Sequence, residues 1–228
     1  MVLRKWEDLP NGMQCDAVRP YYAVLEKKKA SLLLKRCFDI VGAAILLVLL
    51  SVPMLILALC IKLDSKGPVF YRQERITTYG KKFRIHKFRT MIDKADQFGT
   101  AVTVGADRRI TAIGAKLRKY RLDEIPQVLD VLAGNMSFVG TRPEATEYVE
   151  QYTDEMKATL LLPAGITSEA SIAYKDEAEL LAAATDVNRV YVEEILPQKM
   201  QYNLKSIWEF SLRNEIKTML KTVLAVLR

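Results

Sequence analysis

Two adjacent acids, Asp123 and Glu124, have the residue types and the surroundings that phosphate chemistry requires. Arg118 and Arg121 precede them, and Arg142 follows. Neighbouring carboxylates among arginines can hold a magnesium ion and a diphosphate together, because magnesium prefers oxygen ligands. A carboxylate can also attack phosphorus directly, forming an acyl-phosphate that a second phosphate displaces. The arginines would then stabilise the negative charge that develops during such a transfer.

The same pair also has a purely structural interpretation. Asp123 can cap a helix whose first turn tolerates Pro126 and whose end is marked by Gly134. In that case both acids only complement the dipole of the helix. The residues by themselves leave both interpretations open.

The composition narrows the chemistry further. His86 is the only histidine among the 228 residues, which argues against serine–histidine triads and histidine-rich zinc sites. The three cysteines, Cys15, Cys37 and Cys60, fit neither a zinc spacing nor a disulfide framework. A formal net charge of +7 favours anionic partners, which include phosphorylated molecules, acidic lipid and nucleic acid.

One segment is apolar enough to enter a membrane. Residues 40–61 (IVGAAILLVLLSVPMLILALCI) contain no charged residue and match the roughly 20 positions that a spanning helix needs. Lysines and arginines stand on both sides of the segment, so the positive-inside rule predicts no orientation of the segment in the membrane. Ser51 and Pro53 lie near its middle, where proline removes a helix hydrogen bond. A spanning helix with a tolerated proline and a re-entrant helix that leaves by the face it entered are both compatible with this pattern.

The elements that must position the acids follow this segment. Residues 69–76 and 82–89 alternate between apolar and polar around a turn at 77–80, which predicts a β-hairpin with a cationic surface. Residues 111–120 predict a short basic helix, and residues 176–194 are mostly helical in pattern. Residues 204–227 predict one amphipathic helix, which either lies on the membrane or packs on its own domain. We therefore expect an α+β fold that is mainly helical.

The residues around the acid pair resemble the signature of a known family. Residues 114–144 (GAKLRKYRLDEIPQVLDVLAGNMSFVGTRPE) resemble that of the bacterial sugar transferases, the monotopic polyprenyl-phosphate phosphoglycosyl transferases. The Leu-Asp-Glu-x-Pro-Gln run and the Met-Ser-Phe-Val-Gly run are the most specific parts of the likeness. Shorter matches occur at 35–39 (KRCFD), 86–91 (HKFRTM), 165–167 (GIT), 170–172 (ASI) and 175–177 (KDE).

The resemblance implies a division of the chain into three parts. Residues 1–34 form an N-terminal extension of unknown role, and residues 35–66 form a re-entrant membrane helix hairpin broken near Ser51 and Pro53. Residues 67–228 form a small catalytic domain with the β-hairpin and amphipathic interfacial helices. The resemblance places this domain on the cytoplasmic face of the bacterial inner membrane, in contact with its lipid. A homodimer is one open option for its assembly, and nucleic acid is not an expected partner.

The resemblance also implies a magnesium-dependent reaction in two steps. Asp123 would attack the sugar-bearing phosphate of a UDP-sugar and release UMP. Polyprenyl (undecaprenyl) phosphate would then take the phosphosugar, which is the first membrane step of glycoconjugate or polysaccharide biosynthesis. Glu124 would either bind the metal together with Asp123 or have a positioning role in the site. The basic residues that match phosphate-handling positions are Lys87, Arg89, Arg118 and Arg142.

Two alternatives belong beside this interpretation. In the first, a membrane-anchored transferase uses Asp123 and Glu124 only to bind metal and forms no covalent intermediate. In the second, a membrane-tethered basic module binds anionic lipid or nucleic acid without catalysis, through cations interleaved with aromatics such as Phe83 and Phe88. The identity of the sugar is open, because the chain departs from the family pattern in two turns. Thr141 stands where the family usually has proline, and Ala164 and Ser168 stand where it usually has proline and glycine.

Overall fold

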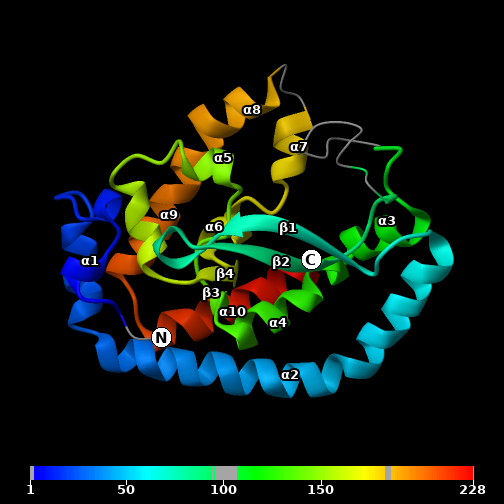
Figure 1. The fold of residues 1–228 in the computed structure, drawn as a ribbon, viewed down its shortest axis with the longest axis horizontal. Coiled ribbons are helices and arrows are strands. Elements are labelled where there is room, and N and C mark those ends of the chain that lie inside the picture. The colour runs from blue at the N-terminus through cyan, green and yellow to red at the C-terminus, as the bar shows by residue number, and fades with distance from the viewer. Residues whose placement is uncertain (1–2, 94, 96–106, 183–185, 228) are drawn as a thin grey trace.

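The computed structural model describes residues 3–93, 95, 107–182 and 186–227. One long helix, α2 (Lys29–Asp64), runs along one side of the molecule, and the other elements form a domain that rests on it (Figure 1). The predicted fold class, α+β and mainly helical, is confirmed. The other helices are α1 (Arg19–Glu26), α3 (Ala112–Lys119), α4 (Val128–Ala133), α5 (Thr146–Val149), α6 (Glu169–Ala173), α7 (Glu177–Ala182), α8 (Val187–Val190), α9 (Leu196–Trp208) and α10 (Leu212–Leu227).

The helix α2 has one face on the domain and one face exposed. Ala43 and Ile61 are buried against the domain, whereas the opposite face is apolar and uncovered. By length and composition α2 is sufficient to cross a membrane. Its exposed large apolar residues are Leu33, Leu34, Phe38, Ile40, Val41, Ile45, Val48, Leu49, Val52, Leu55, Ile56, Leu59 and Leu63.

The predicted break near the middle of α2 takes the form of a bend. The helix is continuous from Lys29 to Asp64, so it begins before the predicted start at Lys35 and is not divided into two helices. Pro53 lies inside it and cannot donate a backbone hydrogen bond, which accounts for a bend in this stretch (Figure 1). Ser51 turns its hydroxyl back to the Val48 carbonyl at 2.8 Å. The re-entrant placement of the helix in a membrane stays a prediction.

Both ends of α2 are tied to the same domain. Near its beginning, the Lys35 Nζ atom donates to the Val139 carbonyl at 2.9 Å. At its end, the Asp64 carboxylate accepts a hydrogen bond from the Ile113 backbone N–H at 3.0 Å. The apolar segment therefore starts and finishes against one protein surface.

The predicted β-hairpin is confirmed. Strands β1 (Phe70–Ile76) and β2 (Lys82–Phe88) pair antiparallel, with Phe70 opposite Phe88. Phe83 and Ile85 point inward from β2 and are buried in the core beneath the hairpin. This alternation of buried and exposed residues along β2 is the pattern that the sequence predicted.

A second, parallel pair of strands is absent from the sequence predictions. Strands β3 (Met136–Val139) and β4 (Ala164–Thr167) pair in parallel, and Met136 lies opposite Ala164. Beyond β3, the backbones of Gly140 and Gly165 approach so closely that a Cβ atom on Gly165 would lie 2.1 Å from the Gly140 nitrogen. Glycine is therefore required at this contact.

The N-terminal extension is part of the packed domain. Val18 and Leu25 are fully buried in a cluster that includes Phe210, which follows α9. The ring of Tyr21 lies 4.9 Å from that of Trp208. Residues 3–28 thus cover α9, and this packing supplies a structural role for a segment whose role was unknown.

The prediction of one continuous amphipathic helix over 204–227 is wrong. Helix α9 ends at Trp208, and Phe210 is buried, so the chain turns before α10 begins. Ser211 accepts a hydrogen bond from the Asn214 backbone at 3.2 Å and starts the new helix. Helix α9 packs in the domain, whereas α10 lies beside α2 (Figure 1) and exposes an apolar face. That face consists of Ile216, Leu220, Val223 and Leu224.

Candidate functional site

The acid pair lies in a short 3-10 turn, Leu122–Gln127, between α3 and α4. Helix α3 starts where the Thr111 hydroxyl accepts a hydrogen bond from the Gly114 N–H at 3.0 Å. It packs closely against the segment that follows β2, where a Cβ atom on Gly114 would lie 2.0 Å from the Thr90 carbonyl oxygen. Arg121 then adopts a left-handed conformation (φ 53°) and turns the chain into the acid-bearing segment.

Asp123 is not a helix cap. The residue in the cap position of the 3-10 turn is Arg121, and among the described residues no side chain caps that turn or helix α4. The predicted end of the following helix at Gly134 is confirmed, since Gly134 has φ 83° there. The acids therefore do not serve as N-terminal caps, although both lie in the first turn of the 3-10 helix, where their charges complement its dipole.

Glu124 is held by two cations from two different elements. Lys87, from β2, donates to Oε1 at 2.8 Å. Arg142, from the loop after β3, pairs with both carboxylate oxygens, with Nη1 3.2 Å from Oε2. Burial favours a raised pKa for Glu124, but the charges and hydrogen bonds of Arg142 and Lys87 outweigh it and hold the pKa well below its usual value. Glu124 is therefore a fixed anion.

Asp123 has the opposite environment. Burial, and then the negative charge of Glu124, raise the pKa of Asp123, while Lys87 and Arg118 oppose the shift. In the described part of the chain, no side chain donates a hydrogen bond to its carboxylate, and the only hydrogen bond that lowers its pKa comes from its own backbone. Arg118 lies nearby, and its Nε atom donates to the Thr90 hydroxyl at 2.9 Å. The two neighbouring acids therefore differ in their partners. Glu124 is fixed by ion pairs with Lys87 and Arg142, whereas the Asp123 carboxylate has no side-chain donor among the described residues and can contact a substrate.

The predicted basic residues fall into two groups. Lys87 and Arg142 contact the acid pair directly, and Arg118 acts on Asp123 through its charge. Arg89 is instead buried at the end of α2, where its Nη2 atom donates to the Ser65 carbonyl at 2.7 Å. The role in phosphate binding stays a prediction for all four.

A residue that sequence reasoning missed fixes the strand that carries Lys87. Asp130, from α4, accepts the His86 backbone N–H at 2.8 Å and contacts the His86 ring nitrogen Nδ1 at 2.8 Å. Asp130 is 1% exposed, so this contact pins β2 to α4. The one signal in the sequence was an acid inside an apolar run, and it did not reveal the partner.

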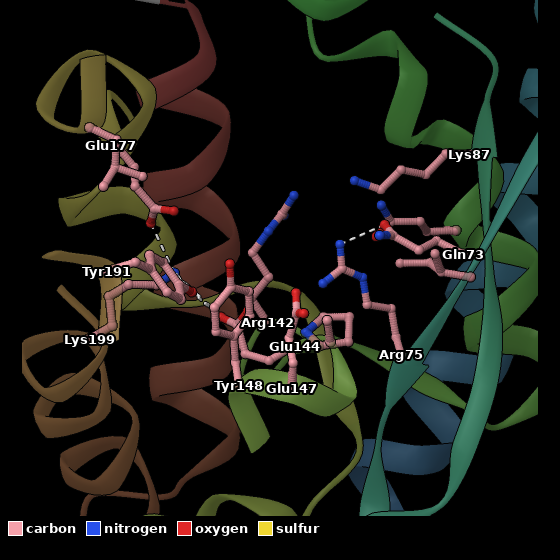
Figure 2. Close-up of a pocket in the computed structure, with 15 residues that line it drawn as sticks. Gln73, Arg75, Lys87, Arg142, Glu144, Glu147, Tyr148, Glu177, Tyr191 and Lys199 are labelled. Carbon is pink, nitrogen blue, oxygen red and sulfur yellow. Dashed lines mark hydrogen bonds and ion pairs between the residues drawn. The ribbon is translucent and has the colours of Figure 1, made fainter. Parts of the chain in front are cut away.

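A cavity of about 150 Å³ opens beside the acid pair. Figure 2 shows Lys87 and Gln73 on the hairpin side, and Glu177, Tyr191 and Lys199 on the opposite side. Arg142 stands between the two sides. The cavity thus begins at the cations that clamp Glu124, whereas neither acid of the pair belongs to its lining.

A second charged cluster, the Lys199 cluster, closes the far end of the cavity. It consists of Glu144, Glu177, Tyr191 and Lys199. The Tyr191 hydroxyl donates to Glu144 at 2.7 Å, and Lys199 donates to the Tyr191 oxygen at 3.0 Å. Lys199 also pairs with Glu177 at 2.9 Å. Sequence reasoning assigned none of these residues, although Glu144 and Glu177 fall within the matched motifs.

The donor set allows a magnesium ion that arrives with substrate. Among the described residues, no group of three or more histidine, cysteine, aspartate or glutamate side chains converges. Magnesium is commonly bound by one or two carboxylates together with substrate phosphates and water. Asp123 and Glu124 fit that requirement as the protein's share of the ligands.

An acid pair framed by cations, on a domain with a long exposed apolar helix, is the arrangement expected of a protein that handles phosphorylated substrates at a membrane. The chain belongs to the bacterial sugar transferase family, whose model matches residues 30–228.

The relatives of known name include three sugar-phosphate transferases. The Aeromonas hydrophila UDP-N-acetylgalactosamine-undecaprenyl-phosphate N-acetylgalactosaminephosphotransferase is 34% identical over 85% of this chain and 44% of its own length. UDP-glucose:undecaprenyl-phosphate glucose-1-phosphate transferases from Escherichia coli K12 and Caulobacter vibrioides are 37% and 35% identical, over 84% and 85% of this chain. The match spans 39% of the Escherichia coli protein and 69% of the Caulobacter protein. This chain therefore corresponds to less than half of the first two relatives.

Proposed function

We propose that this protein transfers a sugar 1-phosphate from a UDP-sugar to polyprenyl phosphate, through a covalent intermediate on Asp123. The observation that carries the proposal is the contrast within the acid pair. Glu124 is ion-paired to Lys87 and Arg142, while Asp123 is adjacent, partly buried and without a side-chain donor among the described residues. The names of the relatives describe sugar-phosphate transfer from UDP-sugars to undecaprenyl phosphate, which supports the same reaction.

In the first step, a carboxylate oxygen of Asp123 attacks the phosphorus that carries the sugar. The bond from that phosphorus to the bridging oxygen breaks, and UMP leaves with the electron pair. In the second step, an oxygen of polyprenyl phosphate attacks the same phosphorus, and the aspartyl bond breaks to regenerate the carboxylate. Lys87, Arg118 and Arg142 stabilise the charge on the phosphoryl oxygens during both steps.

Glu124 has a positioning role in this reaction. It orients Lys87 and Arg142 toward the reacting group, and its negative charge raises the pKa of Asp123 beyond the effect of burial. A bound magnesium ion would neutralise the diphosphate and improve UMP as a leaving group. The acid pair supplies the protein's carboxylates for that ion.

We further propose that α2 is re-entrant and that the catalytic domain lies on the cytoplasmic face of the inner membrane. Two features support this: both ends of α2 are anchored to one domain, and α10 adds a second exposed apolar face beside it. Such a surface would hold the acid pair near the phosphate of a lipid acceptor.

Single cysteines introduced on both flanks of the segment should be labelled only from the cytoplasmic side. Labelling of one flank from outside would contradict the topology.

The proposed activity is tested by measuring UMP release against a panel of UDP-sugars, with and without magnesium and polyprenyl phosphate. We expect sustained UMP release with at least one donor, and only when both magnesium and the lipid acceptor are present. A purified, folded protein that releases no UMP from any UDP-sugar in the presence of the lipid and magnesium would contradict the proposal.

A further inference from the structure

The cavity beside the acid pair contains an unused hydrogen-bond donor. Gln127 lines this cavity and is 1% exposed, and its Nε2 atom has no partner within the described residues. A buried amide without a partner destabilises a protein, so such groups call for a ligand or another function. Arg89 and Ser137 also carry buried atoms that have no partner in the part of the chain that the structure describes, but neither residue lines the cavity.

The charge along the cavity changes from one end to the other. Lys87 and Arg142 stand at the end next to the acid pair. Arg75 is a further cation on the hairpin side, where it donates to Gln73. Further along, Glu147 contributes a carboxylate and Tyr148 a hydroxyl, and the charge of Lys199 is offset there by Glu144 and Glu177. Cations bind phosphate oxygens, whereas carboxylates repel them and accept hydrogen bonds from hydroxyl groups. The cavity therefore suits a ligand with a phosphate at one end and a neutral group rich in hydroxyls at the other.

We propose that this cavity receives the sugar ring of the donor and that the Gln127 amide donates a hydrogen bond to the ring. The inference rests on the proposed function, in which Asp123 attacks the phosphate that carries the sugar. That phosphate must lie beside Asp123, where Lys87 and Arg142 mark the beginning of the cavity. The sugar is bonded directly to this phosphate, while the uridine is separated from it by a second phosphate. The ring is thus the part of the donor that can extend into the cavity.

The experiment compares donors that have a sugar with a nucleotide that lacks one. The variant Gln127→Met preserves the length of the side chain but removes the amide, and Gln201→Met makes the same change on the exposed side of α9 as a control. The measured quantities are kcat/KM for UMP release from UDP-glucose and UDP-N-acetylgalactosamine, and the inhibition constant of UDP. We expect Gln127→Met to lower kcat/KM for the donors roughly 10- to 100-fold. The inhibition constant of UDP should not change, and Gln201→Met should match the unmodified enzyme.

Two outcomes would overturn the inference. If Gln127→Met weakens UDP inhibition as much as donor turnover, the cavity holds the nucleotide half. If donor turnover does not fall, the Gln127 amide does not act on the donor. The variant Gln127→Glu, which has the same size and cannot donate when ionised, should reproduce the selective loss if Gln127→Met unfolds. A separate result, no UMP release by the unmodified protein with any UDP-sugar, would overturn the proposed function itself.

Discussion

Two charged clusters stand at opposite ends of one cavity, and their chemistry differs. In the Lys199 cluster, Lys199 and Tyr191 donate to Glu144, and Lys199 also pairs with Glu177. At the other end, Lys87 and Arg142 satisfy Glu124, but Asp123 beside it has no side-chain donor among the described residues. A buried network whose members satisfy one another stabilises a fold, whereas a carboxylate to which no side chain donates a hydrogen bond is free to react. The comparison assigns stability to the far end and chemistry to the near end.

The largest expected effect is the loss of activity in Asp123→Asn. The amide cannot attack phosphorus, so UMP release should fall by at least about 10⁴-fold. The free energy of unfolding should be maintained or increased, because the substitution removes a buried charge next to Glu124. UMP release and urea unfolding measure the two quantities, and the exposed Asp154→Asn is the matched control. Nearly intact function in Asp123→Asn would favour a non-catalytic binding module.

A substitution in the Lys199 cluster should lower the free energy of unfolding. Lys199→Met removes the cation that forms ion pairs with Glu144 and Glu177, and the cost should be about 3–5 kcal/mol in the free energy of unfolding. Urea denaturation measures this loss of free energy of unfolding. Lys205→Met on the same helix removes an exposed pair with Glu209 and should cost less than about 1 kcal/mol. Equal losses in the two variants would mean that the Lys199 cluster is not a stabilising network.

Arg142→Lys tests the clamp on Glu124. Lysine keeps the positive charge but cannot bind both carboxylate oxygens as a planar fork. We expect kcat/KM for UMP release to fall about 10- to 100-fold, with the protein still folded. Arg189→Lys, on the exposed side of α8, should have no effect on turnover. Full activity in Arg142→Lys would show that a positive charge suffices at this position.

The smallest effect concerns the pH dependence. Burial and the charge of Glu124 raise the pKa of Asp123, so the acid limb of kcat should lie above the ordinary range of an aspartate. Asp123 must be ionised to attack, hence activity falls as the pH drops through that pKa. In Glu124→Gln the neighbouring charge is gone, and the limb of the residual activity should move to lower pH. If the acid limb lies at the same pH in Glu124→Gln as in the unmodified enzyme, the charge of Glu124 does not influence the ionisation of Asp123.

The parts that the sequence predicted are those with local patterns. The hairpin follows from the alternation in residues 69–89, and the apolar segment follows from its length. The resemblance around residues 86–91 and 114–144 singled out Lys87, Glu124 and Arg142 one by one, but their ion pairs were not predicted, and their role in phosphate binding stays a prediction. Each of these signals lies within a short window of the chain.

The parts that escaped prediction depend on contacts between distant residues. The strands β3 and β4 have four residues each and pair in parallel across the intervening chain, so neither shows an alternating pattern of useful length. Asp130 and Lys199 look like ordinary charges until their partners, His86 and Glu144, are placed beside them. The turn before α10 interrupts a helical spacing that continues on both sides.

The central claim, that Asp123 is the nucleophile, is tested most directly by trapping the intermediate. The enzyme is incubated with magnesium and a UDP-sugar labelled in its β-phosphate, in the absence of lipid acceptor, and the label is located by peptide mapping. We predict covalent label on Asp123 that disappears when polyprenyl phosphate is added. Absence of label on Asp123, under conditions in which the complete reaction turns over, would contradict the covalent mechanism.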